Sequence, residues 1–150
     1  PELRVSDDVI VGFPGETEND FNDTMDLVNQ IKFDSYYSII YSKRPGTPAS
    51  KLEDNTPMAE KKERLDVLQA QLNKHHKEHS MSMIGSIQRC LVTGLSKKSA
   101  HQLQARTECN RVVNFDFQNI GFIGKLVDIS IDETFSYSLL GTLHNSTGQN

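Results

Sequence analysis

The sequence predicts an α/β segment followed by an all-β domain, with one long helix connecting the two. The first third alternates β-branched runs with an amphipathic helical pattern, which is typical of a strand–helix–strand unit. Five short β-type segments separated by turn residues follow the long helix and indicate a small barrel. Hydrophobic residues make up 36% of the 150 residues and the net charge is only -4, so a core can form and global disorder is excluded.

The strand–helix–strand unit begins with a β-branched run at 9–11. Thr17 and Asp20 have the spacing of a helix capping box, and apolar residues recur every three or four positions from Phe21 onward. The run at 36–41 reads as a second buried strand. Two strands joined through a helix predict a parallel pair with a crossover connection.

Thr56 followed by Pro57 is a favourable helix start, and one helix is expected from about 57 to 80. The strands of the barrel are expected at 87–93, 102–106, 111–115, 125–131 and 138–143. We therefore expect three parts: residues 1–83 with the α/β unit and the long helix, 84–146 with the barrel, and 147–150 as a tail.

The composition excludes several classes of protein. Cys90 and Cys109 are the only cysteines, so a disulfide scaffold is excluded and an iron–sulfur cluster lacks ligands here. No apolar run approaches the ~20 residues that cross a bilayer, and no signal peptide is visible. We expect a cytoplasmic protein without membrane association. Because the chain begins at Pro1 and not Met, we expect a segment of something longer or a processed product.

The bend after the first strand is the first candidate site. Gly12 and Gly15 allow the backbone to come close to a ligand, and the following helix points its free N–H groups into the same space. A phosphate loop is excluded because no Lys follows the second glycine and the spacing is too short. A plain strand-to-helix turn is the alternative interpretation.

Two cations, Lys43 and Arg44, lie in a proline-stiffened loop at 41–48. At the carboxyl end of a parallel strand such a loop can hold a phosphate or carboxylate. A solvated loop tip explains these residues equally well.

Residues 84–115 carry five Lys or Arg against one acid, although the whole chain is acidic. We expect these cations to share one face that binds a phosphate backbone, with Phe115 and Phe117 as candidates for base stacking. The alternative is a barrel with ordinary surface cations and core phenylalanines, and Phe115 is better explained as core. The block comprises Arg89, Lys97, Lys98, Arg106 and Arg111, together with Asn110 and Asn114.

His75, His76 and His79 include a pair at i, i+4, but no third ligand has a recognisable spacing. We therefore expect no metal site in this chain.

Taken together, the motifs resemble those of the radical S-adenosylmethionine methylthiotransferases, most closely the MiaB-type tRNA enzymes. The resemblance covers nearly the whole chain in the right order. It rests on DVIVGFPGET at 8–17, IIYSKRPGTPAS at 39–50, QARTECNRVVNF at 104–115, IGKLVDISI at 123–131 and SLLGTL at 138–143.

The resemblance implies a partial (β/α) barrel that binds S-adenosylmethionine and a carboxyl-terminal TRAM domain that binds tRNA. The present chain looks like the last strands of that barrel plus the entire TRAM domain. Two 4Fe-4S clusters belong to the complete enzyme, but their cysteine ligands are absent here, so no catalytic residue is expected and this chain alone should be inactive. The cofactor-binding residues implied are Val11, Gly12, Phe13, Pro14, Gly15 and Glu16.

The partner implied is the anticodon stem-loop of tRNA, where the complete enzyme methylthiolates N6-dimethylallyladenosine, and we expect a monomer. Ala105 and Cys109 depart from the family's Gly-Arg-Thr-Glu-Asn-Asn pattern. The alternatives are a stand-alone RNA-binding TRAM module, or a methylthiotransferase for threonylcarbamoyl-adenosine in tRNA or for a ribosomal protein. The RNA-binding residues expected are Lys43, Arg44, Arg89, Lys97, Lys98, Arg106, Asn110 and Arg111.

Overall fold

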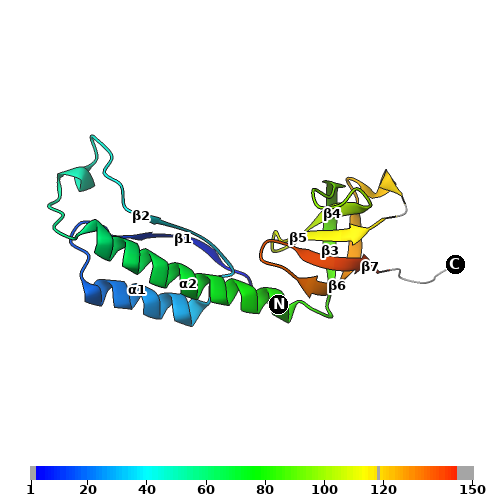
Figure 1. The fold of residues 1–150 in the computed structure, drawn as a ribbon, viewed down its shortest axis with the longest axis horizontal. Helices are drawn as coiled ribbons and strands as arrows, with labels where there is room; N and C mark the ends of the chain where they lie inside the picture. Colours follow the sequence, from blue (N-terminus) through cyan, green and yellow to red (C-terminus); the bar gives the residue numbers. More distant parts are fainter. Residues whose placement is uncertain (1–2, 118, 145–150) are drawn as a thin grey trace. The chain divides into compact units, whose positions relative to one another are not determined.

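A computed structural model describes residues 3–117 and 119–144 of the chain. The chain divides into two compact units, Pro1–Lys77 and Glu78–Asn150, which are described separately. Figure 1 shows the ribbon of both units, coloured along the sequence.

The first unit contains the expected strand–helix–strand arrangement. Strand β1 (Ser6–Val11) pairs in parallel with β2 (Ser35–Ile40), and helix α1 (Glu18–Ile31) makes the crossover. The predicted capping box is confirmed, because the Thr17 hydroxyl accepts from the Asp20 N–H while the Asp20 carboxylate accepts from the Thr17 N–H.

A short 3-10 helix η1 (Pro48–Lys51) precedes the long helix α2 (Met58–Ser82). Helices α1 and α2 run along the two-stranded sheet (Figure 1), and their apolar faces share one core with it. On the opposite face, Ile10 and Tyr37 stay half or more exposed. The buried members of the core are Val11, Phe21, Val28, Phe33, Leu68 and Leu72.

The second unit is a closed five-stranded barrel with the order β3-β4-β5-β7-β6, which confirms the predicted small barrel. All neighbouring strands are antiparallel except β5 and β7, which pair in parallel. The 3-10 helix η2 (Ile120–Phe122) lies between β5 and β6 in the sequence. The strands are β3 (Ile87–Leu95), β4 (Gln102–Thr107), β5 (Val112–Asp116), β6 (Leu126–Thr134) and β7 (Leu139–Leu143).

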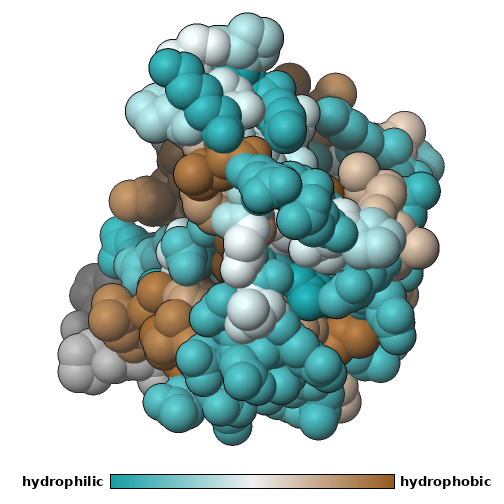
Figure 2. Space-filling view, turned by 90° about the vertical axis from the view of Figure 1, so that its left-hand side faces the viewer, coloured by the Kyte–Doolittle hydropathy of each residue, from teal (hydrophilic) through white to brown (hydrophobic). Residues whose placement is uncertain are grey.

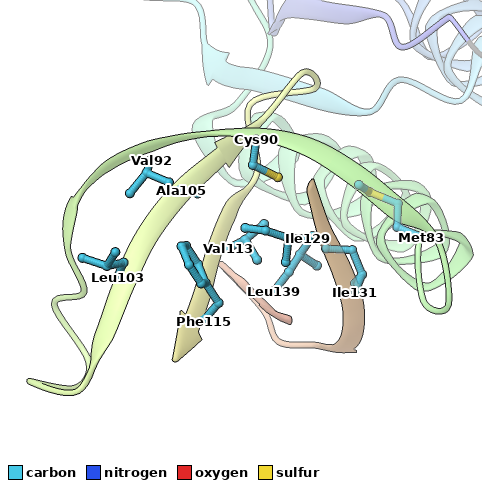
Figure 3. Close-up of a cluster of buried hydrophobic side chains, with 10 residues drawn as sticks. All are labelled: Met83, Cys90, Val92, Leu103, Ala105, Val113, Phe115, Ile129, Ile131 and Leu139. Atoms are coloured by element: carbon cyan, nitrogen blue, oxygen red, sulfur yellow. The ribbon is translucent and has the colours of Figure 1, made fainter. Parts of the chain in front are cut away.

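The barrel encloses the second hydrophobic core (Figure 3), with Cys90, Val113 and Ile129 among its fully buried side chains. Phe115 is 0% exposed and lies in this core. It therefore packs the barrel and cannot stack a base, as the core interpretation of this one residue expects. The barrel core also leaves no room for a side chain at Gly141, since an added Cβ would lie 2.4 Å from Ile129 Cγ2.

The boundary between the units falls at Lys77 and Glu78, six residues before the one expected at 83/84. The last turn of α2 packs with the barrel, because Met83 joins the barrel core and Ser80 is buried. The first unit contains a two-stranded parallel sheet, and the described residues do not form a radical S-adenosylmethionine barrel. The tail expected at 147–150 lies outside the described residues.

The described helices do not combine the length and the apolar character that a membrane span needs. The surface is mostly hydrophilic on the face that Figure 2 shows, with hydrophobic patches separated by polar side chains. The mean hydropathy of -0.51 agrees with this distribution.

Candidate functional site: the glycine bend and the cationic barrel

The bend at 11–16 closes on itself through the Glu16 side chain. Its carboxylate accepts a hydrogen bond from the Gly12 N–H at 3.0 Å. Gly12 has a φ of +71°, a left-handed conformation that L side chains rarely adopt. A Cβ at this position would lie 2.8 Å from Lys61 Cδ. The close approach that this glycine permits is therefore to the stem of Lys61 on α2.

Two buried cations of α2 hold this side of the bend. Arg64 lies 3.1 Å from the Glu16 carboxylate and also donates to the Glu60 carboxylate at 2.6 Å. Lys61 forms an ion pair with Asp54, whose pKa is lowered first of all by the hydrogen bond from Lys61. Both cationic side chains are more than nine-tenths buried. Carboxylates of the first unit thus neutralise both positive charges.

The other side of the bend is more open. Phe13 is 44% exposed and packs edge-on against the Tyr41 ring at 5.2 Å between centroids. Gly15 has open space where a Cβ would be. The Tyr41 hydroxyl is buried and has no hydrogen-bond partner among the described residues. This buried hydroxyl without a partner, on a ring that packs against Phe13 of the bend, is the feature here that a polar ligand can satisfy.

The Lys43 and Arg44 side chains are exposed, as an anion-binding loop requires. The Thr47 N–H and hydroxyl both donate to the Arg44 carbonyl, at 3.3 and 2.8 Å, which folds the loop into a turn. Gly46 completes this turn with a φ of +85°.

The barrel separates the basic block into three environments, so the block does not form one continuous face. Arg111 is only 7% exposed. Its Nε donates to the Ser80 hydroxyl at 3.0 Å and its Nη1 contacts the Cys109 sulfur at 3.2 Å. This guanidinium joins the end of α2 to the β4–β5 turn and cannot reach an RNA phosphate.

A second group lies on the outer surface at one end of β3 and β4. Arg89 and Arg106 point outward by the alternation of buried and exposed residues. The register places Leu91 of β3 opposite Arg106 of β4, so Arg89, two residues before Leu91, is the diagonal neighbour of Arg106. Arg106 Nη1 donates to the carbonyl and the side-chain oxygen of Asn110, both at 3.2 Å. Asp128 of β6 faces Arg89 and reduces the positive charge there.

Lys97 and Lys98 form the third group, in the β3–β4 loop beyond the other end of these strands. Lys97 is exposed. Lys98 Nζ donates to the Ser138 hydroxyl at 2.7 Å and lies over the Phe135 ring at 5.1 Å. Between the two exposed groups β3 runs from Arg89 to Leu95, about 20 Å of extended chain, so the two groups are separate.

The structure also shows site residues that the sequence did not single out. Lys61 and Arg64 contact the bend from α2, although Arg64 is 48 residues from Glu16. Phe135 and Tyr137 are exposed in the turn between β6 and β7, and Phe135 lies beside Lys98. Phe135 and Tyr137 could have been found in the sequence, because they are two aromatic residues flanked by serines in a turn. No local sequence pattern marks Lys61 and Arg64 as neighbours of the bend.

Cysteine and histidine chemistry is limited in the described part of the chain. Burial raises the pKa of the Cys90 thiol to about 12, so it is not a thiolate near neutral pH. No group of three or more His, Cys, Asp or Glu side chains is arranged to hold a metal ion among residues 3–117 and 119–144.

Comparison with known proteins agrees with the geometry. Residues 81–144 match the family model of the TRAM domain. Over 143 residues the chain is 57% identical to the tRNA-2-methylthio-N(6)-dimethylallyladenosine synthase of Legionella pneumophila (strain Corby), covering 95% of this chain and 32% of that protein. The corresponding proteins of Alcanivorax borkumensis and Ectopseudomonas mendocina are 52% identical over 142 residues and 49% identical over 150 residues.

The second unit thus contains a TRAM domain at 81–144, and its closed five-stranded barrel is consistent with that class of domain. Over 95% of its length the chain is similar to tRNA-2-methylthio-N(6)-dimethylallyladenosine synthases, at 52–57% identity. It spans about a third of the length of the relatives that it matches.

Proposed function

We propose that this chain is part of a tRNA methylthiotransferase that adds a methylthio group to N6-dimethylallyladenosine beside the anticodon, in the cytoplasm. The observation that carries the proposal is the 57% identity over 95% of the chain, which includes both units. A stand-alone RNA-binding module would need only the barrel. The similar relatives are named for the dimethylallyladenosine reaction, which favours it over threonylcarbamoyl-adenosine or a ribosomal protein.

The TRAM domain is proposed to bind the anticodon stem-loop of tRNA through its exposed cations. Contacts with phosphate oxygens supply most of the sequence-independent affinity for RNA. Arg111 is omitted from this interface because its guanidinium is buried and hydrogen-bonded. The contact residues retained are Arg89, Lys97, Lys98, Arg106 and Asn110.

The first unit is proposed to belong to the cofactor-binding domain of the complete enzyme. Parallel sheets in α/β proteins are covered on both faces and contain more than two strands. Here β1 and β2 pair only with each other among the described strands, and Ile10 is exposed on their uncovered face. Such a sheet is consistent with a strand–helix–strand unit that packs against further strands of a larger domain.

The bend at 11–16 fits S-adenosylmethionine on one side only. Lys61 fills the approach to Gly12, whereas Phe13, Gly15 and the unpartnered Tyr41 hydroxyl offer an apolar edge, open space and a polar group. These three residues would contact the cofactor, and Glu16 would hold the bend in shape. When bound, S-adenosylmethionine supplies the methyl group and the radical chemistry of the reaction.

The two 4Fe-4S clusters do not fit this chain. Cys90 is buried in the barrel core with a raised pKa, and Cys109 lies in the β4–β5 turn beside Arg111. Two thiols in these positions do not form a cluster ligand set.

Lys43 and Arg44 are proposed to contact the tRNA substrate. Both side chains are exposed in a stiff loop that follows β2, and their positive charge suits a polyanionic substrate.

A chimera tests the proposal. The corresponding third of the Legionella pneumophila synthase is replaced by this chain, and methylthiolation of dimethylallyladenosine-containing tRNA is measured. We expect an active chimera and no activity from the 150-residue chain alone. A folded chimera that binds tRNA but does not modify it contradicts the proposed reaction.

A further inference from the structure

Two loops of the barrel meet in a corner where a cation contacts one exposed aromatic ring, and a second exposed ring follows two residues later in the same turn. Lys98 of the β3–β4 loop donates to the Ser138 hydroxyl, and its ammonium lies over the Phe135 ring. The Phe135 N–H donates to the Ser138 carbonyl at 2.8 Å, which closes the turn that carries Tyr137. The corner defined by Lys98, Phe135 and Tyr137 is therefore held by hydrogen bonds from two parts of the sequence.

The two rings are unusually open to solvent. Tyr137 is 93% exposed, the highest value among the large hydrophobic side chains in the described part of the chain, and Phe135 is 51% exposed. The Tyr137 ring is thus available, and the Phe135 ring is available away from the face that the Lys98 ammonium covers, in contrast to the buried Phe115 ring that the sequence offered for stacking. Exposed aromatic rings beside cations are the combination with which proteins bind single-stranded nucleic acid.

We propose that this corner binds an unpaired nucleotide of the RNA substrate, with its base stacked on Phe135 or Tyr137 and its phosphate near Lys97 and Lys98. The inference rests on the proposed function, and it adds a contact to a base where that function needs only phosphate contacts. Stacking requires an unpaired base, so the corner recognises a loop or a single strand and not a continuous duplex.

The neighbouring charges fix the side from which the phosphate approaches. Asp132 and Glu133 belong to β6, which ends one residue before Phe135. The Asp132 carboxylate accepts a hydrogen bond from the Thr142 hydroxyl at 2.7 Å. These acids repel a phosphate on the β6 side of the turn. The RNA backbone is therefore expected to approach from the β3–β4 loop at 96–101, which carries Lys97 and Lys98.

The experiment measures binding of the 150-residue chain to three fluorescent probes: an intact tRNA, an unpaired RNA hexamer containing 2-aminopurine, and a fully paired RNA duplex. The variants are Phe135→Leu and Tyr137→Ala, which remove a ring. Tyr137→Phe keeps the ring. Ile120→Ala is the matched control, because Ile120 is a 61% exposed apolar side chain on η2.

We expect the two ring-removing variants to bind the hexamer about fivefold more weakly or worse, which is the lower end of one lost stacking contact. The quenching of 2-aminopurine by stacking should fall in parallel, a change that a purely structural role does not produce. Tyr137→Phe, Ile120→Ala and all duplex measurements should match wild type. Lys98→Gln should lower the salt dependence of binding, whereas removal of a ring should leave it unchanged.

Wild-type affinity and quenching in both ring-removing variants overturn the inference, as does a wild-type chain that binds tRNA but not the hexamer. These results leave the proposed function intact. A wild-type chain that binds neither tRNA nor hexamer contradicts the proposed role of the barrel itself, so the two failures are distinguishable.

Discussion

The Arg64 guanidinium lies 3.1 Å from the Glu16 carboxylate, and the exposed fractions of these two side chains are only 8% and 11%. This ion pair links the second turn of α2 to the bend that follows β1. The same carboxylate accepts from the Gly12 N–H, so one interaction ties the helix, the glycine and the start of α1 together.

Replacement of Arg64 by Met should therefore destabilise the chain by about 3–5 kcal/mol, because it leaves the Glu16 carboxylate buried and unpaired. The free energy of unfolding in urea measures the effect. Adding Glu16→Gln to Arg64→Met should recover part of the loss, since the amide oxygen still accepts from Gly12 without carrying a charge. Glu60→Gln is the control, because Glu60 is 48% exposed and its pair with Arg64 contributes little. Equal losses for Arg64→Met and Glu60→Gln contradict this role of the buried pair.

Gly141→Ala should destabilise the barrel by about 1–3 kcal/mol or more. The new methyl group would meet Ile129 Cγ2 at 2.4 Å and the Ser130 carbonyl oxygen at 2.7 Å, which overpacks the core. Gly94→Ala is the matched control, because the space around its position in β3 is open. Thermal unfolding followed by circular dichroism compares the two variants. A Gly141→Ala protein as stable as Gly94→Ala shows that the barrel is less tightly closed at β7.

Cys90 should make the chain less stable at alkaline pH. Its pKa is raised to about 12 by burial first and then by the charge of Asp128, whereas the unfolded thiol titrates near 9. Between these values the unfolded state has lost its proton and the folded state has kept it, so stability falls as pH rises, by up to about 1.4 kcal/mol per pH unit. Below the unfolded pKa the contribution is fully present.

The measurement for Cys90 is the free energy of unfolding from pH 7 to pH 11 for wild type and Cys90→Ala. The variant loses some packing at every pH, but its stability should decline less steeply above pH 9. Parallel curves for the two proteins contradict the buried-thiol interpretation.

Arg111 and Arg106 should respond in opposite ways to replacement, although both come from the same basic block. Arg111→Ala should lower the melting temperature, because it removes the hydrogen bond to Ser80 and leaves a buried gap. Arg106→Ala should leave stability nearly unchanged and weaken binding to tRNA, since its side chain is on the outer surface. Melting curves and tRNA titrations of both variants decide the question. A strong effect of Arg111→Ala on RNA affinity without any loss of stability would refute the structural role assigned to Arg111.

Local patterns were sufficient to predict the elements of the fold. The capping box at Thr17 is decided by residues three apart, and the alternation along β6 is visible within a single strand. The parallel pairing of β5 with β7 was not predictable in this way. It joins strands separated by η2 and β6, and no periodicity records which distant strands become neighbours.

For the candidate sites, the sequence identified individual residues but not the distant residues that they contact. Sequence reasoning found Gly12 but assigned its close approach to a ligand, because Lys61 lies 49 positions away along the chain. It grouped Arg111 with the exposed cations, because the Ser80 partner 31 residues earlier is visible only in the folded chain. The corner of Lys98 with Phe135 likewise depends on two loops that the barrel brings together.

In the proposed function the outer cations of the barrel bind the tRNA backbone, and the salt dependence of the affinity reports this contact. The affinity of the 150-residue chain for tRNA is determined at several salt concentrations for wild type and for Arg89→Gln, Lys97→Gln, Lys98→Gln and Arg106→Gln. We predict that each replacement lowers the slope of log affinity against log salt by roughly 0.7–0.9, the contribution of one released counterion. Four variants with the wild-type slope and affinity would show that these cations do not contact RNA.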